Sequence, residues 1–396
     1  MNDRMSRLRR MMGDPVPAVK RPGQENVSNL PEGGEWIAQG VYLLETFHPL
    51  GEALGNTTLE ALPLASDRLS PWGGATPACF LDLETTGLAG GTGTYAFLAG
   101  IGTLEAGALK VRQVFLSSPS REPEWLEAVE GFVPSGAGFV TYNGRRFDLP
   151  LLQTRAILAR REPFRAGSPH LDLLWLARSL WRCSLPSCRL GEVERSILGV
   201  QREVEDVPGW QIPSLYADFL RTRDALPLAG VFLHNRLDIL SLAALKAHVG
   251  RIVAGEINRG QELLLAGDLW ASRGEWDQAA NFWRNALDAP ESRGEAMLRL
   301  ASRAKAEKQW DAAVDLWEQS RSTCRPSLSV LEELAKAYEH RLHKLGEALS
   351  RAEEGLRQLE SRRAFGGSSW LIERQAWVHR IERLKKKIDA QKVKFR

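Results

Sequence analysis

The chain has 396 residues, of which 43% are apolar and 26% are charged, and this composition suits two or three globular domains. It contains no run of eighteen or more apolar residues, so neither a transmembrane helix nor a membrane partner is expected. A basic start without a following apolar stretch indicates a cytoplasmic rather than a secreted protein. The net charge of +3 is too small to identify a partner, and the basic ends favour solvated surfaces over phosphate contacts.

The first part of the chain has weak structural signals. Residues 1–35 are polar and rich in Gly, Pro and Arg, which predicts a flexible basic arm. Residues 36–74 are expected to be an accessory segment, in which GVYLLETFHPLG suits a strand or a hairpin. The stretch SPWGGATPA then marks a domain boundary. Four irregularly spaced cysteines complete no zinc site, and we expect free thiols.

Strands and helices alternate over residues 75–250. Four segments read as strands, namely CFLDLE, YAFLAGIG, LKVRQVFL and GFVTY. Helical patterns are predicted near residues 122–132, 147–161, 171–181, 189–198, 214–223 and 228–249. This order predicts an α/β domain with a mixed sheet flanked by helices.

A helical repeat is predicted over residues 258–360. Trp276, Ala279 and Trp283 recur 34 residues later as Trp310, Ala313 and Trp317, and this is the period of tetratricopeptide repeats. LEELAKAYEHRLHKLGEALSRAEEGL is a third, looser unit, so three repeats can bury a continuous core. Residues 368–396 are predicted to form a capping helix with a basic outer face. A protein partner docking on the repeats is one possible use of this domain.

Two carboxylates interrupt an apolar strand in FLDLETTG. Residues i and i+2 of a strand point to the same face, so Asp82 and Glu84 project together. Two like charges this close repel each other unless a cation lies between them. Oxygen ligands of this kind suit Mg²⁺ or Mn²⁺.

Two later segments contribute further candidate ligands. GFVTY runs into NGRRFDLPLL, so Asn143 and Asp148 open a helix directly after a strand, although an aspartate there often serves only as a cap. In HNRLDILSLAALKAHV, His234 and Asp238 lie one turn apart on one face of a helix. A lone histidine of this kind is more often structural, but four carboxylates and one histidine in this order favour a functional site.

These motifs resemble those of a known superfamily. DxETTG from Asp82, NxxxFD ending at Asp148 and HxxxD ending at Asp238 are similar to the three exonuclease motifs of the DEDD superfamily. FLDLETTGLAGGTGTYAFLAGIG, TYNGRRFDLPLL, HLDLLWLARSLWR and FLHNRLDILSL most resemble YprB-type ribonuclease-H-like proteins. The resemblance covers roughly residues 75 to 250, and the tetratricopeptide-like tail agrees with it.

The resemblance implies a ribonuclease-H-like fold and two divalent cations, Mg²⁺ or Mn²⁺, with single-stranded DNA or RNA as the substrate. The implied metal ligands are Asp82, Glu84, Asp148 and Asp238, and His234 would be the general base. The four-residue spacing from His234 to Asp238 departs from the pattern, because it is typical of members that use tyrosine. Residues expected near the terminal nucleotide, the metals or the phosphates are Thr85, Thr86, Asn143, Arg145, Arg146 and Arg236.

Other interpretations remain open. GLAGGTGT lacks the Lys-Ser/Thr of a phosphate-binding loop, so we interpret it as a tight turn that lets the substrate approach. Asp172 is expected to cap a helix rather than to bind metal. The leading prediction is a metal-dependent 3′→5′ exonuclease. The alternatives are a non-catalytic scaffold that binds partners through its repeats, and an endonuclease on the same fold.

Overall fold

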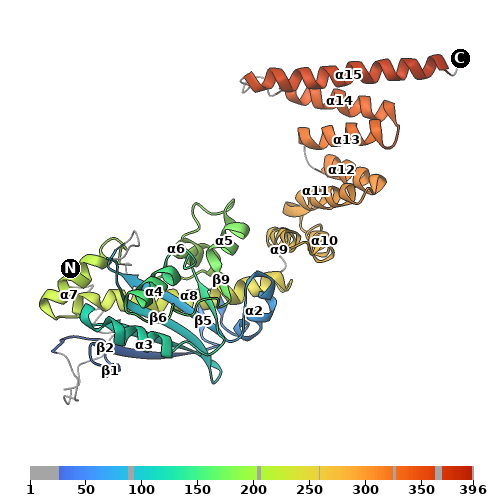
Figure 1. Cartoon of the computed structure of the whole chain (residues 1–396). Coiled ribbons are helices and arrows are strands. Elements are labelled where there is room, and N and C mark those ends of the chain that lie inside the picture. The colour runs from blue at the N-terminus through green and yellow to red at the C-terminus, as the bar shows by residue number, and fades with distance from the viewer. Residues whose placement is uncertain are drawn as a thin grey trace. The chain divides into compact units, whose positions relative to one another are not determined.

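The computed structural model describes residues 26–87, 93–202, 207–257, 259–323, 327–361 and 368–394. The chain divides into two compact units, Met1–Glu256 and Ile257–Arg396. The first unit contains a mixed sheet flanked by helices and the second is helical, so the predicted fold class is confirmed (Figure 1). Most of the predicted basic arm lies outside the described residues.

Seven strands form the central sheet in the order β1-β2-β7-β6-β5-β8-β9. β8 runs parallel to both β5 and β9, and the other neighbours are antiparallel. The strands are β1 Glu35–Ala38, β2 Val41–Pro49, β5 Ala78–Thr85, β6 Ala96–Glu105, β7 Ala108–Leu116, β8 Gly138–Thr141 and β9 His170–Asp172. β5 to β8 are the four strands that the sequence predicts.

The segment expected to be accessory builds one edge of this sheet. β2 pairs with β7 along its whole length, and β1 pairs with the outer side of β2. The first four residues of β2 are all buried, which hides the alternating pattern that marks a half-buried strand. A small hairpin, β3 Ala53–Leu54 with β4 Thr57–Thr58, follows this edge.

Helices cover both faces of the sheet (Figure 1). Leu81 and Leu83 of β5 point into a core shared with α3 and α4, where the Trp125 indole N–H also donates to the carbonyl of Val114 at 2.9 Å. The intervening residues of β5 face the long helix α8. The helices of this unit are α2 Leu62–Arg68, α3 Glu122–Gly131, α4 Asp148–Leu158, α5 Leu173–Trp181, α6 Leu190–Val193, α7 Ile212–Thr222 and α8 Ala229–Val253.

α8 is a long helix with many apolar residues. With the turn before it, Leu226–Val253 is long and apolar enough to cross a membrane by composition, but 72% of its most apolar window is buried inside the protein. No other such helix exists in the described parts of the chain. A core position between the sheet and α2 accounts for this composition.

The second unit is built from consecutive helix pairs. Its helices are α9 Gly260–Ser272, α10 Trp276–Asn285, α11 Pro290–Ala306, α12 Trp310–Thr323, α13 Leu328–His340, α14 Leu345–Ser361 and α15 Ser368–Lys394. Each of the first three pairs packs internally, and α15 packs on α14. The repeat-related residues Trp283 and Trp317 are buried alike, at 4% and 3% exposure. Trp276 differs, because it is 41% exposed and the Arg303 guanidinium lies over its ring.

The basic face of α15 is partly used within the protein. Arg383 and Lys387 both pair with Glu339 of α13, and Arg380 pairs with Glu332. Burial alone would raise the pKa of the Glu339 carboxyl, but Arg383 and Lys387 outweigh it and lower the pKa to about 2. Much of the charge that the sequence suggests is solvated therefore joins the last helix to the repeat before it.

Candidate active site

Asp82 and Glu84 lie near the carboxyl end of β5, on the face covered by α8. The neighbouring strand β6 carries glycine at the contact positions 100 and 102. A Cβ atom at Gly100 would lie 2.5 Å from the Asn235 side chain, and one at Gly102 would lie 2.6 Å from Ile239. The AGIG sequence therefore lets the backbone of α8 approach the sheet closely enough for its side chains to reach the acids of β5.

Asn235 joins α8 directly to the first acid. Its amide N–H donates to Asp82 Oδ2 at 2.9 Å and to the Asp82 carbonyl at 3.2 Å, while its Oδ1 accepts from Gln113 at 3.1 Å. Asn235 is fully buried. Asn235 is not among the residues predicted from the sequence, although an amide one position after His234 on an otherwise apolar helix face is a usable signal.

Asp148 begins α4 directly after a tight turn that follows β8. Asn143 in that turn has φ of 67°, a left-handed conformation that asparagine tolerates. The Asp172 carboxylate accepts from the backbone N–H of Asn143 at 2.8 Å and also caps α5 through Leu174. A Cβ at Gly144 would lie 2.6 Å from Asp148 Oδ2. The expected capping role of Asp172 is confirmed, and the same carboxylate also holds the turn before Asp148.

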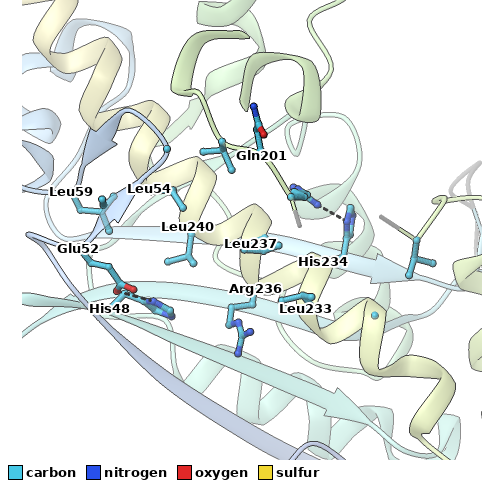
Figure 2. A pocket seen from close by; sticks show the side chains of 16 residues that line it. His48, Glu52, Leu54, Leu59, Gln201, Leu233, His234, Arg236, Leu237 and Leu240 are labelled. Atoms are coloured by element: carbon cyan, nitrogen blue, oxygen red, sulfur yellow. Dashed lines mark hydrogen bonds and ion pairs between the residues drawn. The ribbon is translucent and has the colours of Figure 1, made fainter. Parts of the chain in front are cut away.

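His234 reaches the acids from α8. Its Nε2 lies 3.7 Å from Glu84 Oε1 and 3.5 Å from Asp238 Oδ2. Its Nδ1 lies 2.9 Å from a guanidinium nitrogen of Arg202 (Figure 2). A guanidinium only donates, so Nδ1 accepts, and a neutral His234 in this arrangement carries its proton on Nε2, facing the carboxylates. In this state His234 is a donor toward the acids and not a base.

Arg202 is the main site residue that sequence reasoning missed. Its guanidinium bonds Asp238 Oδ1, and it also contacts both carboxylate oxygens of Glu194, at 3.0 and 2.7 Å. Arg202 belongs to none of the three motifs, and its segment lies 36 residues before Asp238 in the chain. Only the fold brings it to the acids.

The carboxyl groups of the site raise one another's pKa values. Burial is the largest cause for each of the four, and it raises the pKa of Asp82 to about 7, with the charge of Asp238 as the second cause. The pKa values of Glu84 and Asp148 are raised well above their ordinary range, first by burial and then by the charge of Asp82. Burial also raises the pKa of Asp238, although His234 and Arg202 oppose this. A cation placed among these groups would offset the cost of burying their charged forms and would reduce the repulsion between them.

The donor set fits divalent cations in its chemistry. Carboxylate oxygens are the ligands that Mg²⁺ and Mn²⁺ prefer. Glu84 Oε1 is buried and accepts no hydrogen bond, so it has an unused acceptor facing the site. Within the described ranges, however, no three Asp, Glu, His or Cys side chains already close around one point as metal ligands. Arg202 on Asp238 is one reason, because a guanidinium holds the carboxylate that a metal would need.

The other residues predicted to contact substrate differ in their contacts and exposure. The Thr85 hydroxyl donates to the Gly87 carbonyl at 2.8 Å, and the Thr86 hydroxyl accepts from the Tyr95 N–H at 2.9 Å. Arg145 and Arg146 are exposed on the turn before α4. Both threonines therefore order the strand ends beside the acids. Residues 88–92 of the glycine-rich turn and Cys324 lie outside the described residues, and the three described cysteines are free thiols.

Comparison with known proteins agrees with this arrangement. The RNase H superfamily matches residues 79–250, which span the strands and helices that carry the acids. An uncharacterized protein, YprB of Bacillus subtilis (strain 168), is 35% identical over 286 residues, which cover 70% of this chain and 68% of that protein. The chain belongs to the YprB family. The matched RNase H superfamily region supports a nuclease-like activity for the family's α/β unit, and it includes every candidate metal ligand.

Proposed function

We propose that the protein is a divalent-metal-dependent 3′→5′ exonuclease that hydrolyses phosphodiester bonds at single-stranded ends of DNA or RNA and releases nucleoside 5′-monophosphates. The observation that supports this most is the cluster of four carboxyl groups with raised pKa values, in which the buried Oε1 of Glu84 accepts no hydrogen bond. Burying such a cluster lowers the stability of the protein. Its presence therefore indicates a role in binding or chemistry.

Four residues would hold two Mg²⁺ or Mn²⁺ ions, namely Asp82, Glu84, Asp148 and Asp238. When bound, the ions supply stabilisation of the negative charge that develops on the attacking and leaving oxygens. Asn235 fixes Asp82 from α8, and Asp172 fixes the turn that presents Asp148. The protein thus holds its acids from three separate elements, so that their relative positions are set before substrate arrives.

His234 is the proposed proton acceptor, and Arg202 governs when it can act. Taking a proton at Nε2 requires the other tautomer, in which Nδ1 carries a hydrogen and no longer accepts from Arg202. Movement of Arg202 away from His234 would also break its bond to Asp238 Oδ1. If cations are held at this site, Arg202 would have to leave both residues, so that Asp238 could serve as a ligand and His234 as a base.

The second unit gives a further role to the same chain. Three internally packed helix pairs, two of which carry equivalent buried tryptophans, support a tetratricopeptide-like array over residues 258–360, closed by α15. Such arrays dock extended protein segments on one face. We propose that this unit recruits a protein partner while the first unit acts on nucleic acid.

The direct test is digestion of 5′-labelled single-stranded DNA and RNA of matched sequence with Mn²⁺. The expected result is progressive shortening from the 3′ end by wild type and no shortening by Asp82→Asn. The matched control is Asp218→Asn, which removes an exposed carboxylate of α7 in the same unit and should leave shortening unchanged. Undiminished shortening by Asp82→Asn would refute the proposal, and cleavage of circular strands would indicate an endonuclease instead.

A further inference from the structure

A cavity of about 440 Å³ lies beside the acid cluster, on the side of α8 away from Asp82. Its walls come from the β2 end and the β3–β4 hairpin, from residues 200–202, and from α8 (Figure 2). His234 and Arg202 line it, so the cavity and the acid cluster share a wall. The apolar part is formed by Leu54, Leu59, Leu237 and Leu240. The size falls within the range of about 300–1,000 Å³ that small ligands occupy.

Arg236 supplies the charge in this cavity. It extends from α8 below the leucines (Figure 2), and it also lines a smaller cavity of about 140 Å³ next to β2. Its side chain is partly buried. Among the described residues no carboxylate pairs with Arg236 and no acceptor bonds it. A partly buried guanidinium without an anion is costly, which indicates that its partner arrives from outside.

Apart from Glu32 in the smaller cavity, the other charged groups of the two cavities already have partners within the protein. Glu52 pairs with His48 at 3.5 Å, and Glu45 pairs with Lys110 and Arg112. Arg202 is held by Glu194 and Asp238. Glu32 lines the smaller cavity, and its buried Oε1 accepts no hydrogen bond. In the larger cavity, the Arg236 guanidinium is therefore the cation without an anionic partner among the described residues, and it lies beside an apolar surface.

We propose that this cavity is a nucleotide subsite: the phosphate of one nucleotide of the substrate strand pairs with Arg236, and its base lies against the leucines of α8 and the β3–β4 hairpin. A nucleotide combines an anion with a flat, weakly polar body, and the cavity has a place for each. The histidine rings and the guanidinium plane at its ends suit base stacking. The β3–β4 hairpin and β2 supply part of the wall of this subsite, and the strand that carries Asp82 and Glu84 does not. The inference rests on the proposed function, since the strand must reach the adjacent acids.

The test measures binding of a fluorescent single-stranded oligonucleotide in EDTA, where cleavage cannot occur. Arg236→Met removes the guanidinium and keeps a similar apolar length. We expect affinity at low salt to fall by about tenfold, the size of one charge-assisted hydrogen bond. The slope of log affinity against log salt should become less steep by about 0.7, the value for one phosphate contact on a single strand. The thermal midpoint should rise, because an unpaired desolvated charge is lost.

Two further variants keep the test decisive. Leu54→Trp fills the apolar part from the hairpin and should weaken binding without touching Arg236. Arg221→Gln removes one exposed positive charge of the same unit and should change neither affinity nor slope.

Unchanged binding and slope in Arg236→Met would overturn the subsite even if the wild type digests strands. Weakened binding with the altered slope would support it even if no digestion occurs. If AMP binds to wild type and loses affinity in Arg236→Met while the oligonucleotide does not, the subsite serves free mononucleotides and the strand assignment is wrong.

Discussion

The acids of the candidate site should make the metal-free protein less stable as pH rises, and Asp82 is the residue with which to test this. The folded protein raises the pKa of Asp82 to about 7, by burial first and by the charge of Asp238 second. An aspartate in an unfolded chain has a pKa of about 3.9. Between these values the folded state keeps a proton that the unfolded state has lost, so the free energy of unfolding falls as pH rises.

The magnitude follows from the difference between the two pKa values. At about 1.4 kcal/mol per pKa unit, a difference of three units lowers the free energy of unfolding by about 4 kcal/mol. This loss is complete above about pH 7 and absent below about pH 4. Part of this belongs to the neighbouring acids, because the carboxyl groups titrate together. Asp82→Asn removes the charge and keeps an oxygen that can accept from Asn235, so the variant should be the more stable protein at pH 8.

Urea unfolding in EDTA at pH 5 and pH 8 checks this prediction. Because the chain has two units, pulse proteolysis with mass spectrometry of peptides from β5 to β8 should follow the first unit alone. The difference between wild type and Asp82→Asn should grow from pH 5 to pH 8 by at least about 1 kcal/mol. Mn²⁺ should then stabilise wild type more than the variant. Equal pH dependence in the two proteins would refute the reasoning that burial and repulsion dominate this site.

Three further outcomes are expected. Arg202→Gln should lower the free energy of unfolding without metal by about 3 kcal/mol, since it removes the guanidinium that pairs with Glu194 and Asp238, and should tighten Mn²⁺ binding by about tenfold in calorimetry. Gly144→Ala should cost about 1–3 kcal/mol and reduce strand digestion, because its Cβ would lie 2.6 Å from Asp148, whereas Gly131→Ala meets no atom within 4 Å and should leave digestion unchanged. Asp172→Ala should cost about 1–2 kcal/mol in urea unfolding and lower digestion, and Asp172→Asn should restore part of both.

Most of the fold could be predicted from the sequence because its strands and helices have clear periods. β5 to β8 and the long α8 have apolar patterns that local chemistry explains. β1 and β2 have weaker sequence signals, since β2 begins with four buried residues in a row. β9 is only three residues long and leads straight into α5, so helical periodicity masks it. Short strands and edge pairing depend on the sheet into which they fit.

The candidate site was predictable only where its residues form local motifs. Asp82 with Glu84, and His234 with Asp238, are spaced by the strand and helix periods, so each pair can be read from the chain. Arg202 and Gln113 reach the cluster across 36 and 122 residues of sequence, and no local pattern specifies such contacts. The charge state of the site depends on these long-range neighbours, which is why the tautomer of His234 follows from the structure alone.

The products of strand digestion test the central proposal most directly. Linear single strands carrying a 5′ label should be incubated with Mn²⁺, and the released material identified by mass spectrometry for wild type and Asp82→Asn. Wild type should release nucleoside 5′-monophosphates and keep the label on a shortening strand, and the variant should give neither product. Internal fragments in place of mononucleotides, or the same products from both proteins, would contradict it.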